Sequence, residues 1–239
     1  MSMSLLSSEE FYAKNYQFYE DAKSMKSSYM KAIDMLVADN IERGPVLDVG
    51  CGDGLRALNI AGDYKSDVVG MDNCAEMVEM ANQNGIQTVL HEDITALSDK
   101  TKTQFQGRFA TIFCLWNVLG HIIRLEDRKR AMRNIVTLLA DDGLLFVDVN
   151  NRLNICQYGL FRSLRNAVIG IFQKEKGLFV LPINDSVTQV YLSSKKEFIS
   201  LLKGSGLQLE CLVYVNYQSG EIEKKSWCGQ LLAVCRKKL

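Results

Sequence analysis

Residues 46–54 read VLDVGCGDG, an apolar segment that gives way to glycines at alternate positions, Gly50, Gly52 and Gly54. An unbroken apolar run of this kind is typical of a parallel strand that helices cover on both faces. Glycine adopts backbone angles that other residues resist, and it lets a ligand approach the main chain. The stretch therefore predicts a buried strand that ends in a ligand-binding turn at the start of a helix.

The spacing of the glycines indicates which ligand this turn accepts. A turn that binds pyrophosphate reads G-x-G-x-x-G, whereas this one reads G-x-G-x-G, which favours a nucleoside without phosphates. Asp72 stands 22 residues after Gly50, at the end of the next predicted strand, where a carboxylate can accept hydrogen bonds from both ribose hydroxyls. A coincidental strand-to-helix turn is the alternative, and the combination of the glycines with Asp72 weighs against it.

Strand and helix patterns alternate along most of the chain, as in a doubly wound α/β fold. Five short, β-branched-rich apolar segments predict strands over 45–50, 67–72, 87–93, 109–116 and 143–149. Between them lie helical patterns such as 74–85 and 126–143, and the N-terminal residues 8–38 also have helical spacing. Further along, we expect a strand over 188–192, a helix from about 194 to 203, and final strands over 209–217 and 229–238.

Length and composition limit the classes of protein that the chain can belong to. A chain of 239 residues suits a single domain, 1–239, because hydrophobic cores stop growing near roughly 250 to 300 residues. Lys plus Arg equals Asp plus Glu at 28 each, so there is no overall positive charge to favour nucleic acid. Without an apolar run of about eighteen residues, a membrane span is not expected either. We therefore expect a cytoplasmic protein.

The seven cysteines form no C-x-x-C pair, and several lie inside apolar runs such as TIFCLW. This placement predicts buried free thiols rather than a disulfide framework. With only two histidines, the chain also lacks suitable ligands for zinc, so no metal is expected.

The segments VLDVGCGDG, VVGMDNCAEM, HEDI and FATIFCLWNVLGHI, in this order, resemble those of the class I S-adenosylmethionine-dependent methyltransferases, and the resemblance covers residues 46–150. The resemblance implies a Rossmann-like, seven-stranded sheet of order 3-2-1-4-5-7-6 with strand 7 antiparallel. Segments 209–217 and 229–238 would be strands 6 and 7. It also implies that S-adenosylmethionine is the cofactor and S-adenosylhomocysteine the product.

The same resemblance assigns cofactor contacts to motif positions. The methionine part would lie against the glycine turn, the ribose against Asp72, and the adenine beside residues after the second and third strands. The full set is Asp48, Gly50, Cys51 and Gly52 for methionine, Asp72 for ribose, Asn73, Met77, Asp93 and Ile94 for adenine, and Leu115 and Trp116 facing the cofactor and the acceptor. Asp93 could instead be a simple helix cap, and Cys74 stands where relatives often carry serine.

The acceptor should lie beyond the carboxyl ends of the strands, where open α/β sheets bind their ligands. We expect an N-terminal helical lid over residues 1–40 and a substrate-side insert over 153–190 to close over it. His121 could act as a general base or only pack, and the tyrosines at 12, 16 and 19 could face the cofactor or only dock their helix. The residues predicted to bind the acceptor are Tyr16, Asn117, Asn150, Asn151, Phe161 and Arg165.

These features together predict in-line transfer of a methyl group to a nitrogen or oxygen atom of a small molecule. Two alternatives stay open: an RNA-modifying methyltransferase, which the neutral net charge disfavours, and a regulatory module that binds S-adenosylmethionine without activity. The oligomeric state does not follow from the sequence.

Overall fold

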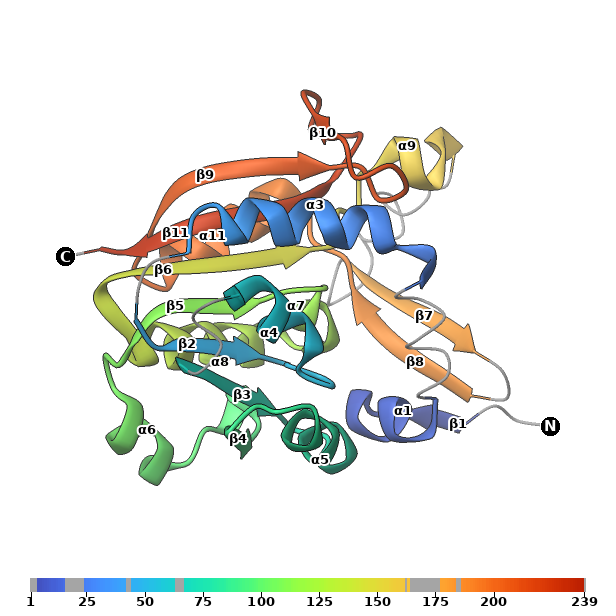
Figure 1. Ribbon diagram of the computed structural model, residues 1–239. Coiled ribbons are helices and arrows are strands. Elements are labelled where there is room, and N and C mark those ends of the chain that lie inside the picture. The colour runs from blue at the N-terminus through green and yellow to red at the C-terminus, as the bar shows by residue number, and fades with distance from the viewer. Residues whose placement is uncertain are drawn as a thin grey trace.

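The computed structural model describes residues 4–15, 24–41, 44–62, 67–161, 163, 177–183 and 186–238. Its centre is an eight-stranded sheet with helices on both faces (Figure 1). The strands of this sheet are β2 (Val46–Val49), β3 (Val68–Asp72), β4 (Thr88–His91), β5 (Phe109–Cys114), β6 (Leu139–Val149), β9 (Leu207–Val215), β10 (Ile222–Glu223) and β11 (Gln230–Lys237).

The strand order is β10-β9-β11-β6-β5-β2-β3-β4. Strands β2 to β6 run parallel to their neighbours, and β11 enters antiparallel between β6 and β9. The seven principal strands therefore have the predicted order 3-2-1-4-5-7-6 with strand 7 antiparallel. The short edge strand β10 was not expected from the sequence, and it pairs with the end of β9.

Helices cover the sheet in two layers, each with its own apolar core. The helices are α1 (Ser8–Lys14), α3 (Ser27–Ala38), α4 (Leu55–Ala61), α5 (Ala75–Gln83), the 3-10 helix η2 (Ile94–Ala96), α6 (Asp99–Phe105), α7 (Val118–His121), α8 (Leu125–Leu138), α9 (Ile155–Tyr158) and α11 (Lys195–Gly204). One core packs α3, α4 and α5 on the sheet, and the other packs α6, α8 and α11. Side chains alternate between the two, as Val46 and Leu47 do on β2, because neighbouring strand residues point to opposite faces.

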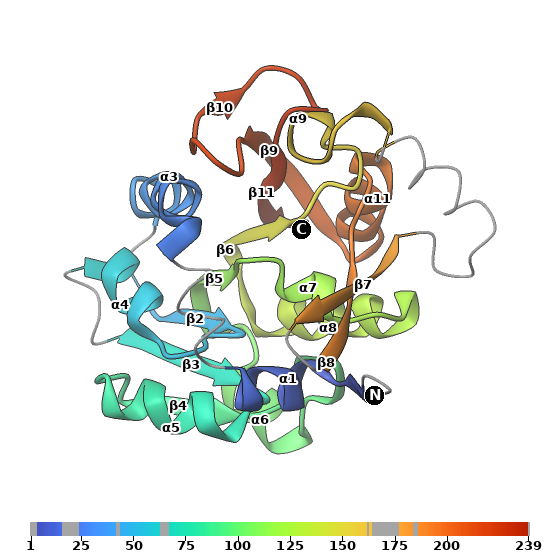
Figure 2. The same ribbon diagram turned by 90° about the vertical axis from the view of Figure 1, so that its right-hand side faces the viewer.

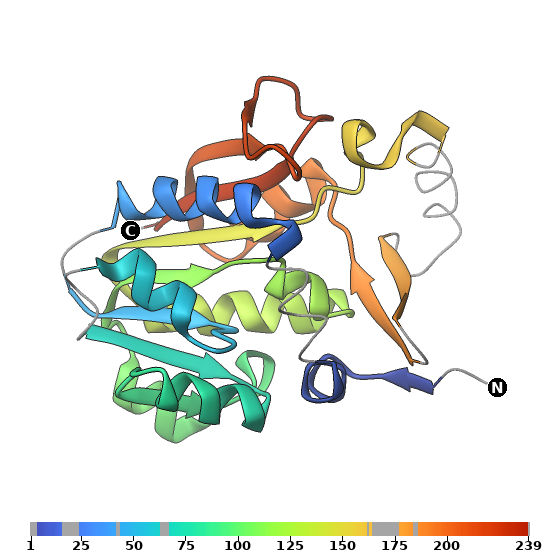
Figure 3. The same ribbon diagram turned by 45° about the vertical axis from the view of Figure 1, so that its right-hand side comes forward.

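A second, three-stranded sheet lies beyond the carboxyl ends of the parallel strands. It consists of β1 (Ser4–Leu6), β8 (Ser186–Tyr191) and β7 (Leu178–Ile183). Strand β1 pairs parallel with β8, which joins the N-terminal segment to the insert that follows β6. In Figures 2 and 3, α1 (dark blue) and the β7–β8 hairpin (orange) lie together at this end of the molecule. Of these strands, only the region of β8 was predicted.

Two predicted helices are wrong in extent. The continuous helix predicted over 8–38 is interrupted, because α1 ends at Lys14 and the Asn15 side chain donates a hydrogen bond to the Phe11 carbonyl (3.0 Å). The helix predicted over 126–143 ends at Leu138, because the next residue, Leu139, pairs with Phe109 and begins β6.

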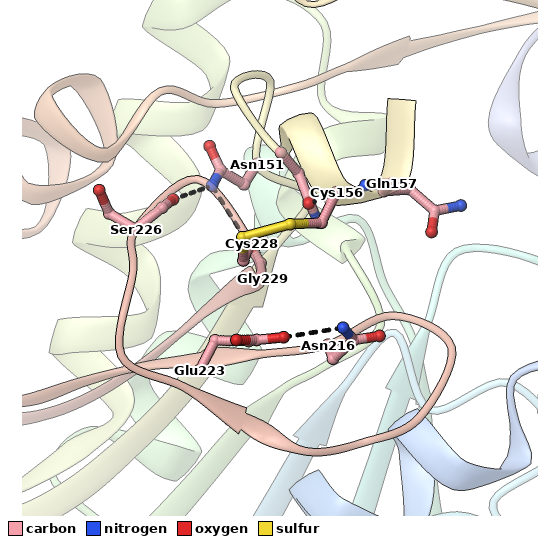
Figure 4. The surroundings of a disulfide bond; sticks show 9 residues. Asn151, Cys156, Gln157, Asn216, Glu223, Ser226, Cys228 and Gly229 are labelled. Atoms are coloured by element: carbon pink, nitrogen blue, oxygen red, sulfur yellow. Dashed lines mark hydrogen bonds between the residues drawn. A yellow bond between two sulfur atoms is a disulfide. The ribbon is translucent and has the colours of Figure 1, made fainter. Parts of the chain in front are cut away.

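The prediction that all cysteines are free is also wrong. Cys156, on α9, and Cys228, in the loop before β11, form a disulfide across 72 residues of sequence (Figure 4). Cys51, Cys74, Cys114 and Cys235 are free and buried, as predicted, and Cys211 is free and exposed. The sequence spacing does not reveal the pair, since the antiparallel insertion of β11 brings the two segments together.

None of the helices in the described ranges combines the length and the apolar character that crossing a bilayer requires.

Candidate functional site

A pocket lies at the carboxyl ends of β2, β3, β4 and β5, and it contains every residue predicted to contact the cofactor, from Asp48 to Trp116. His121 also lines it. The lid helix α1 supplies part of the far wall through Ser8 and Tyr12. The structure thus brings the predicted cofactor residues of four strand ends into one cavity and closes it with the N-terminal segment.

The glycine turn is held in shape by hydrogen bonds to β3. Gly50 and Cys51 donate their backbone N–H groups to the Met71 carbonyl at 2.7 Å and 3.1 Å. Gly50 has φ of +73°, and Gly52 has φ of +55°. These left-handed angles suit glycine, so the predicted need for bare backbone is confirmed at both positions.

Asp72 is the residue that links the glycine turn to the start of α5. Its Oδ2 accepts a hydrogen bond from the Gly52 N–H (2.9 Å), and its Oδ1 accepts one from the Cys74 N–H (3.0 Å). Burial raises the pKa of Asp72, and these backbone donors oppose the rise. Because a carboxylate oxygen has two lone pairs, both oxygens can still accept a bond from a ribose hydroxyl.

Asp48 and Arg56 form a charged group deeper in the pocket. Burial raises the pKa of Asp48 to about 7, while the positive charge of Arg56 opposes this rise. The Arg56 Nε donates to Asp34 Oδ1 (2.7 Å), and its Nη2 is buried with no hydrogen-bond partner among the described residues. A cation and two carboxylates in one place fit the zwitterionic amino acid end of S-adenosylmethionine.

The predicted adenine side combines apolar and polar walls. Met77 and Ile94 are buried there, and Asn73 and Asp93 line the same part of the pocket. Asp93 also caps η2, because its Oδ1 accepts a hydrogen bond from the Thr95 N–H (2.7 Å). Asp93 therefore caps η2, as the alternative prediction had it, and also lines the pocket.

The segment after β5 turns sharply at the edge of the pocket. Trp116 and Asn117 both have positive φ, 62° and 61°, which is uncommon for residues other than glycine. The Asn117 N–H donates to Asp148 Oδ1, and the Tyr29 hydroxyl donates to Asp148 Oδ2, both at 2.7 Å. This buried carboxylate at the end of β6 holds the strained turn that places Trp116 in the pocket wall.

His121 and Tyr12 meet across the pocket. The Tyr12 hydroxyl lies 3.0 Å from His121 Nε2, and their rings meet edge to face. His121 Nδ1 is buried and has no hydrogen-bond partner among the described residues. Burial lowers the pKa of His121 to about 4, so its imidazole is neutral at neutral pH.

Of the residues predicted to bind the acceptor, the four that the structure describes, Asn117, Asn150, Asn151 and Phe161, do not line this pocket. Asn117 caps α7 and its Oδ1 accepts the Asn150 N–H (2.9 Å). Asn151 is buried, and its Nδ2 donates to the carbonyls of Ser226 (2.7 Å) and Gly229 (2.9 Å). These asparagines are thus engaged in holding loops together.

Among its described residues, the insert supplies no side chain to this pocket. Phe161 is 87% exposed and does not line the pocket. Tyr16 and Arg165 lie outside the described residues. Residues of α1 line the pocket, and β8 of the insert packs against both α1 and α7.

Sequence reasoning missed several pocket residues. The polar ones are Ser8, Arg56 and Glu92, and Tyr12 was expected only as one member of a tyrosine face. Arg56 lies in the first turn of the helix that follows the glycine turn, so its position in the motif could have indicated it. Ser8 gave no signal, because it reaches the pocket only through the pairing of β1 with β8.

Comparison with known proteins agrees with this geometry. A family model described as a methyltransferase domain matches residues 22–212. The uncharacterized protein MJ1252 of Methanocaldococcus jannaschii is 27% identical over 228 residues, covering 90% of this chain and 82% of that protein. A glycine/sarcosine N-methyltransferase of Aphanothece halophytica is 28% identical over 111 residues, which cover 44% of this chain and 40% of that enzyme.

Among solved structures, the 1,6-didemethyltoxoflavin-N1-methyltransferase of Burkholderia thailandensis, with bound S-adenosylhomocysteine, aligns with a TM-score of 0.64. At 15% identity, covering 97% of this chain and 87% of that one, this likeness shows the fold alone. The family model spans most of the chain, so the chain belongs to the methyltransferase-domain family. The predicted relationship to S-adenosylmethionine-dependent methyltransferases is confirmed, and S-adenosylmethionine is the cofactor of this class.

Within the described part of the chain, no three His, Cys, Asp or Glu side chains are grouped so that they could hold a metal ion.

Proposed function

We propose that this chain transfers the methyl group of S-adenosylmethionine to a nitrogen or oxygen atom of a small molecule. The observation that carries the proposal is the single pocket that unites the glycine turn, Asp72 and Asp93 with Trp116 and His121. Asp72 would hold the ribose, Met77 and Ile94 would flank the adenine, and Asp48 with Arg56 would hold the amino acid end. Trp116, His121 and Tyr12 are then left to face the acceptor.

Methyl transfer from a sulfonium depends mainly on alignment, because the donor carries a good leaving group and the reaction is an in-line displacement. The chain's own contribution is to hold the acceptor beside the donor and to exclude water. Tyr12 on α1 and His121 on α7 close the pocket from opposite sides, and both helices rest against β8. This arrangement supports a lid that fixes the acceptor rather than a separate acid–base apparatus.

The environment of His121 bears on the predicted role of a general base. A base works best when its pKa lies near the working pH, and burial lowers the pKa of His121 to about 4. A neutral imidazole of such low basicity takes a proton poorly from an ammonium or a phenol. We therefore assign His121 the role of a neutral hydrogen-bonding group. The methyl acceptor would then bind with its reacting nitrogen or oxygen already unprotonated, so that a lone pair is available.

A small-molecule acceptor is supported over RNA. Lys plus Arg equals Asp plus Glu over the whole chain, and the polar pocket wall carries the carboxyl groups of Asp48, Asp72, Glu92 and Asp93. Such a surface does not attract a phosphate backbone. Relatives of the same family include glycine/sarcosine N-methyltransferases and a ubiquinone biosynthesis O-methyltransferase, which agrees with a small acceptor but does not choose between nitrogen and oxygen.

The test is transfer of an isotope-labelled methyl group from S-adenosylmethionine to a pool of cellular metabolites by the purified full-length chain. We expect label in one small molecule and matching formation of S-adenosylhomocysteine. Asp72→Asn keeps the size of the side chain but removes its charge, and it should lose this activity. Label in nuclease-sensitive RNA would support the RNA alternative, and binding of S-adenosylhomocysteine without any transfer would support the inactive module.

A further inference from the structure

The disulfide between Cys156 and Cys228 lies near the carboxyl end of β6. Cys156 is on α9, soon after the carboxyl end of β6. Cys228 precedes β11, whose Leu231 is paired with Val149 at the same end of β6. The bond therefore ties the beginning of the insert to the loop between β10 and β11 (Figure 4).

Hydrogen bonds hold these two segments together without any contribution from the sulfur atoms. The Ile155 N–H donates to the Trp227 carbonyl (2.8 Å). Asn151 Nδ2 donates to the carbonyls of Ser226 (2.7 Å) and Gly229 (2.9 Å), on both sides of Cys228. Because these bonds survive reduction, the two thiols would stay close, which gives the closing reaction a high effective concentration.

The two cysteines also differ from the others in accessibility. Cys156 is exposed, and Cys228 is half-buried. Four of the five free cysteines are buried, and burial raises the pKa of those thiols, which keeps them protonated and unreactive. Cys211, the exposed free thiol, is on β9 and has no sulfur partner in the described residues. A small reagent in solution thus reaches Cys156 with a second thiol beside it.

We propose that Cys156 and Cys228 are a reversible thiol–disulfide pair that responds to small-molecule disulfides such as oxidised glutathione. The Cys156 thiolate attacks one sulfur of the small disulfide, forming a mixed disulfide and releasing one thiolate. The Cys228 thiolate then attacks the Cys156 sulfur and releases the second. Two protein thiols are oxidised, one small disulfide is reduced to two thiols, and the reverse sequence reopens the pair.

The pair is connected to the pocket through aromatic side chains. The first residue of β11, just after the disulfide loop, pairs with the last residue of β9. Tyr217, which follows β9, meets Tyr29 edge to face with ring centroids 4.9 Å apart. The Tyr29 hydroxyl donates to Asp148, the carboxylate that holds the turn at Trp116 in the pocket wall. Closing the pair fixes the loop before β11, so the redox state acts through these contacts on the Trp116 side of the pocket. The placement of the acceptor on the Trp116 side of the pocket rests on the proposed function.

The first test equilibrates the full-length chain with mixtures of reduced and oxidised glutathione, followed by acid quenching, alkylation and mass spectrometry. We expect Cys156 and Cys228 to lose their alkylating label together as the mixture becomes more oxidising. Cys211→Ser should leave this transition unchanged, whereas Cys156→Ser should leave Cys228 unable to form an internal bond. A pair that stays oxidised in every mixture, or that never forms a mutual bond, would overturn the proposal.

The second test measures the connection to the pocket. The chain has two tryptophans, so Trp227→Phe leaves Trp116 as the single tryptophan, which is excited selectively above the tyrosine absorption. Trp227 is half exposed, which makes the change tolerable. We expect the Trp116 emission to differ between the oxidised and reduced forms, with the Kd for S-adenosylhomocysteine changing by less than about twofold. Unchanged emission would overturn the connection. Neither readout requires catalysis, so a failure of the proposed activity is distinguishable from a failure of this inference.

Discussion

The hydroxyl of Tyr12 on the lid helix α1 lies 3.0 Å from Nε2 of His121 on α7, although 109 residues separate them in the sequence. Both helices pack against β8, the strand of the insert that also pairs with β1. Strand β8 therefore supports the pair from behind. This geometry makes Tyr12 the residue through which α1 contacts α7 at the pocket.

Tyr12→Phe should weaken the closed lid while keeping the aromatic ring. The change removes the hydroxyl that contacts His121 Nε2 and leaves that nitrogen buried, which costs about 1 to 3 kcal/mol for an unsatisfied group. We expect a lower free energy of unfolding in urea and slower methyl transfer, with modest loss of affinity for S-adenosylhomocysteine.

A double-mutant cycle with His121→Gln separates the hydrogen bond from other effects of the tyrosine. If the two residues interact as the structure shows, the Tyr12→Phe effect shrinks in the His121→Gln background. Equal effects in both backgrounds would show that the contact contributes nothing to stability.

The buried imidazole of His121 should make the fold sensitive to mild acid. Burial lowers its pKa from 6.5 to about 4, so between these pH values the unfolded chain binds a proton that the folded chain does not. The free energy of unfolding therefore falls as the pH drops through this window, by up to about 3 kcal/mol. Urea unfolding at several pH values should show this slope in the wild-type chain and a flatter one in His121→Gln. Identical slopes would mean that His121 titrates normally.

The gathering of the predicted cofactor residues in one pocket followed from the sequence because its determinants are local. Gly50, Gly52 and Asp72 each follow directly from a strand end, and parallel strands bring their carboxyl ends to one edge. The main chain itself shapes much of the predicted cofactor half, so few side-chain contacts between distant segments had to be foreseen.

The acceptor half was not predictable in the same way. Asn117 and Asn151 lie at the expected strand ends, but their side chains hold neighbouring loops through bonds to residues far along the chain. Tyr12 reaches the pocket because Ser4 pairs with Ser186, a register that no local pattern encodes. Contacts between residues so far apart in the sequence depend on the topology of the whole chain. For the same reason the sequence did not predict the Cys156–Cys228 bond.

Cofactor affinity should depend on pH through Asp48. Burial raises its pKa to about 7, so near neutral pH a fraction of the free chains carries a protonated Asp48. The cofactor brings a positively charged sulfonium and ammonium, which favour the ionised carboxylate and so release a proton on binding. Affinity for S-adenosylmethionine should therefore rise between about pH 6 and pH 8. Calorimetry in buffers of different ionisation enthalpy measures this proton, and its absence in the wild-type chain would contradict the assignment.

Asp72→Ala should weaken cofactor binding and also loosen the glycine turn. It removes the acceptor that we propose for two ribose hydroxyls, and it removes the acceptor observed for the N–H groups of Gly52 and Cys74. A loss of about 1 to 3 kcal/mol is expected for bonds to a charged group, measured as the Kd of S-adenosylhomocysteine. Glu79→Ala, an exposed change on the neighbouring helix α5, is the control and should leave Kd unchanged. Unchanged affinity in Asp72→Ala would remove Asp72 from the site.

Gly50→Ala should damage both the fold and the site, and Gly107→Ala provides a matched comparison. Both glycines have positive φ, +73° and +62°, so alanine strains the backbone by roughly 1 to 2 kcal/mol at either position. A Cβ at Gly50 would also lie 2.6 Å from Val118 Cγ2, whereas a Cβ at Gly107 would meet nothing within 4 Å. We expect a larger loss of unfolding free energy for Gly50→Ala, and only this variant should lose affinity for S-adenosylhomocysteine. Adding Val118→Ala should recover part of the loss, and equal losses for the two single variants would show that contact with α7 is not what requires glycine.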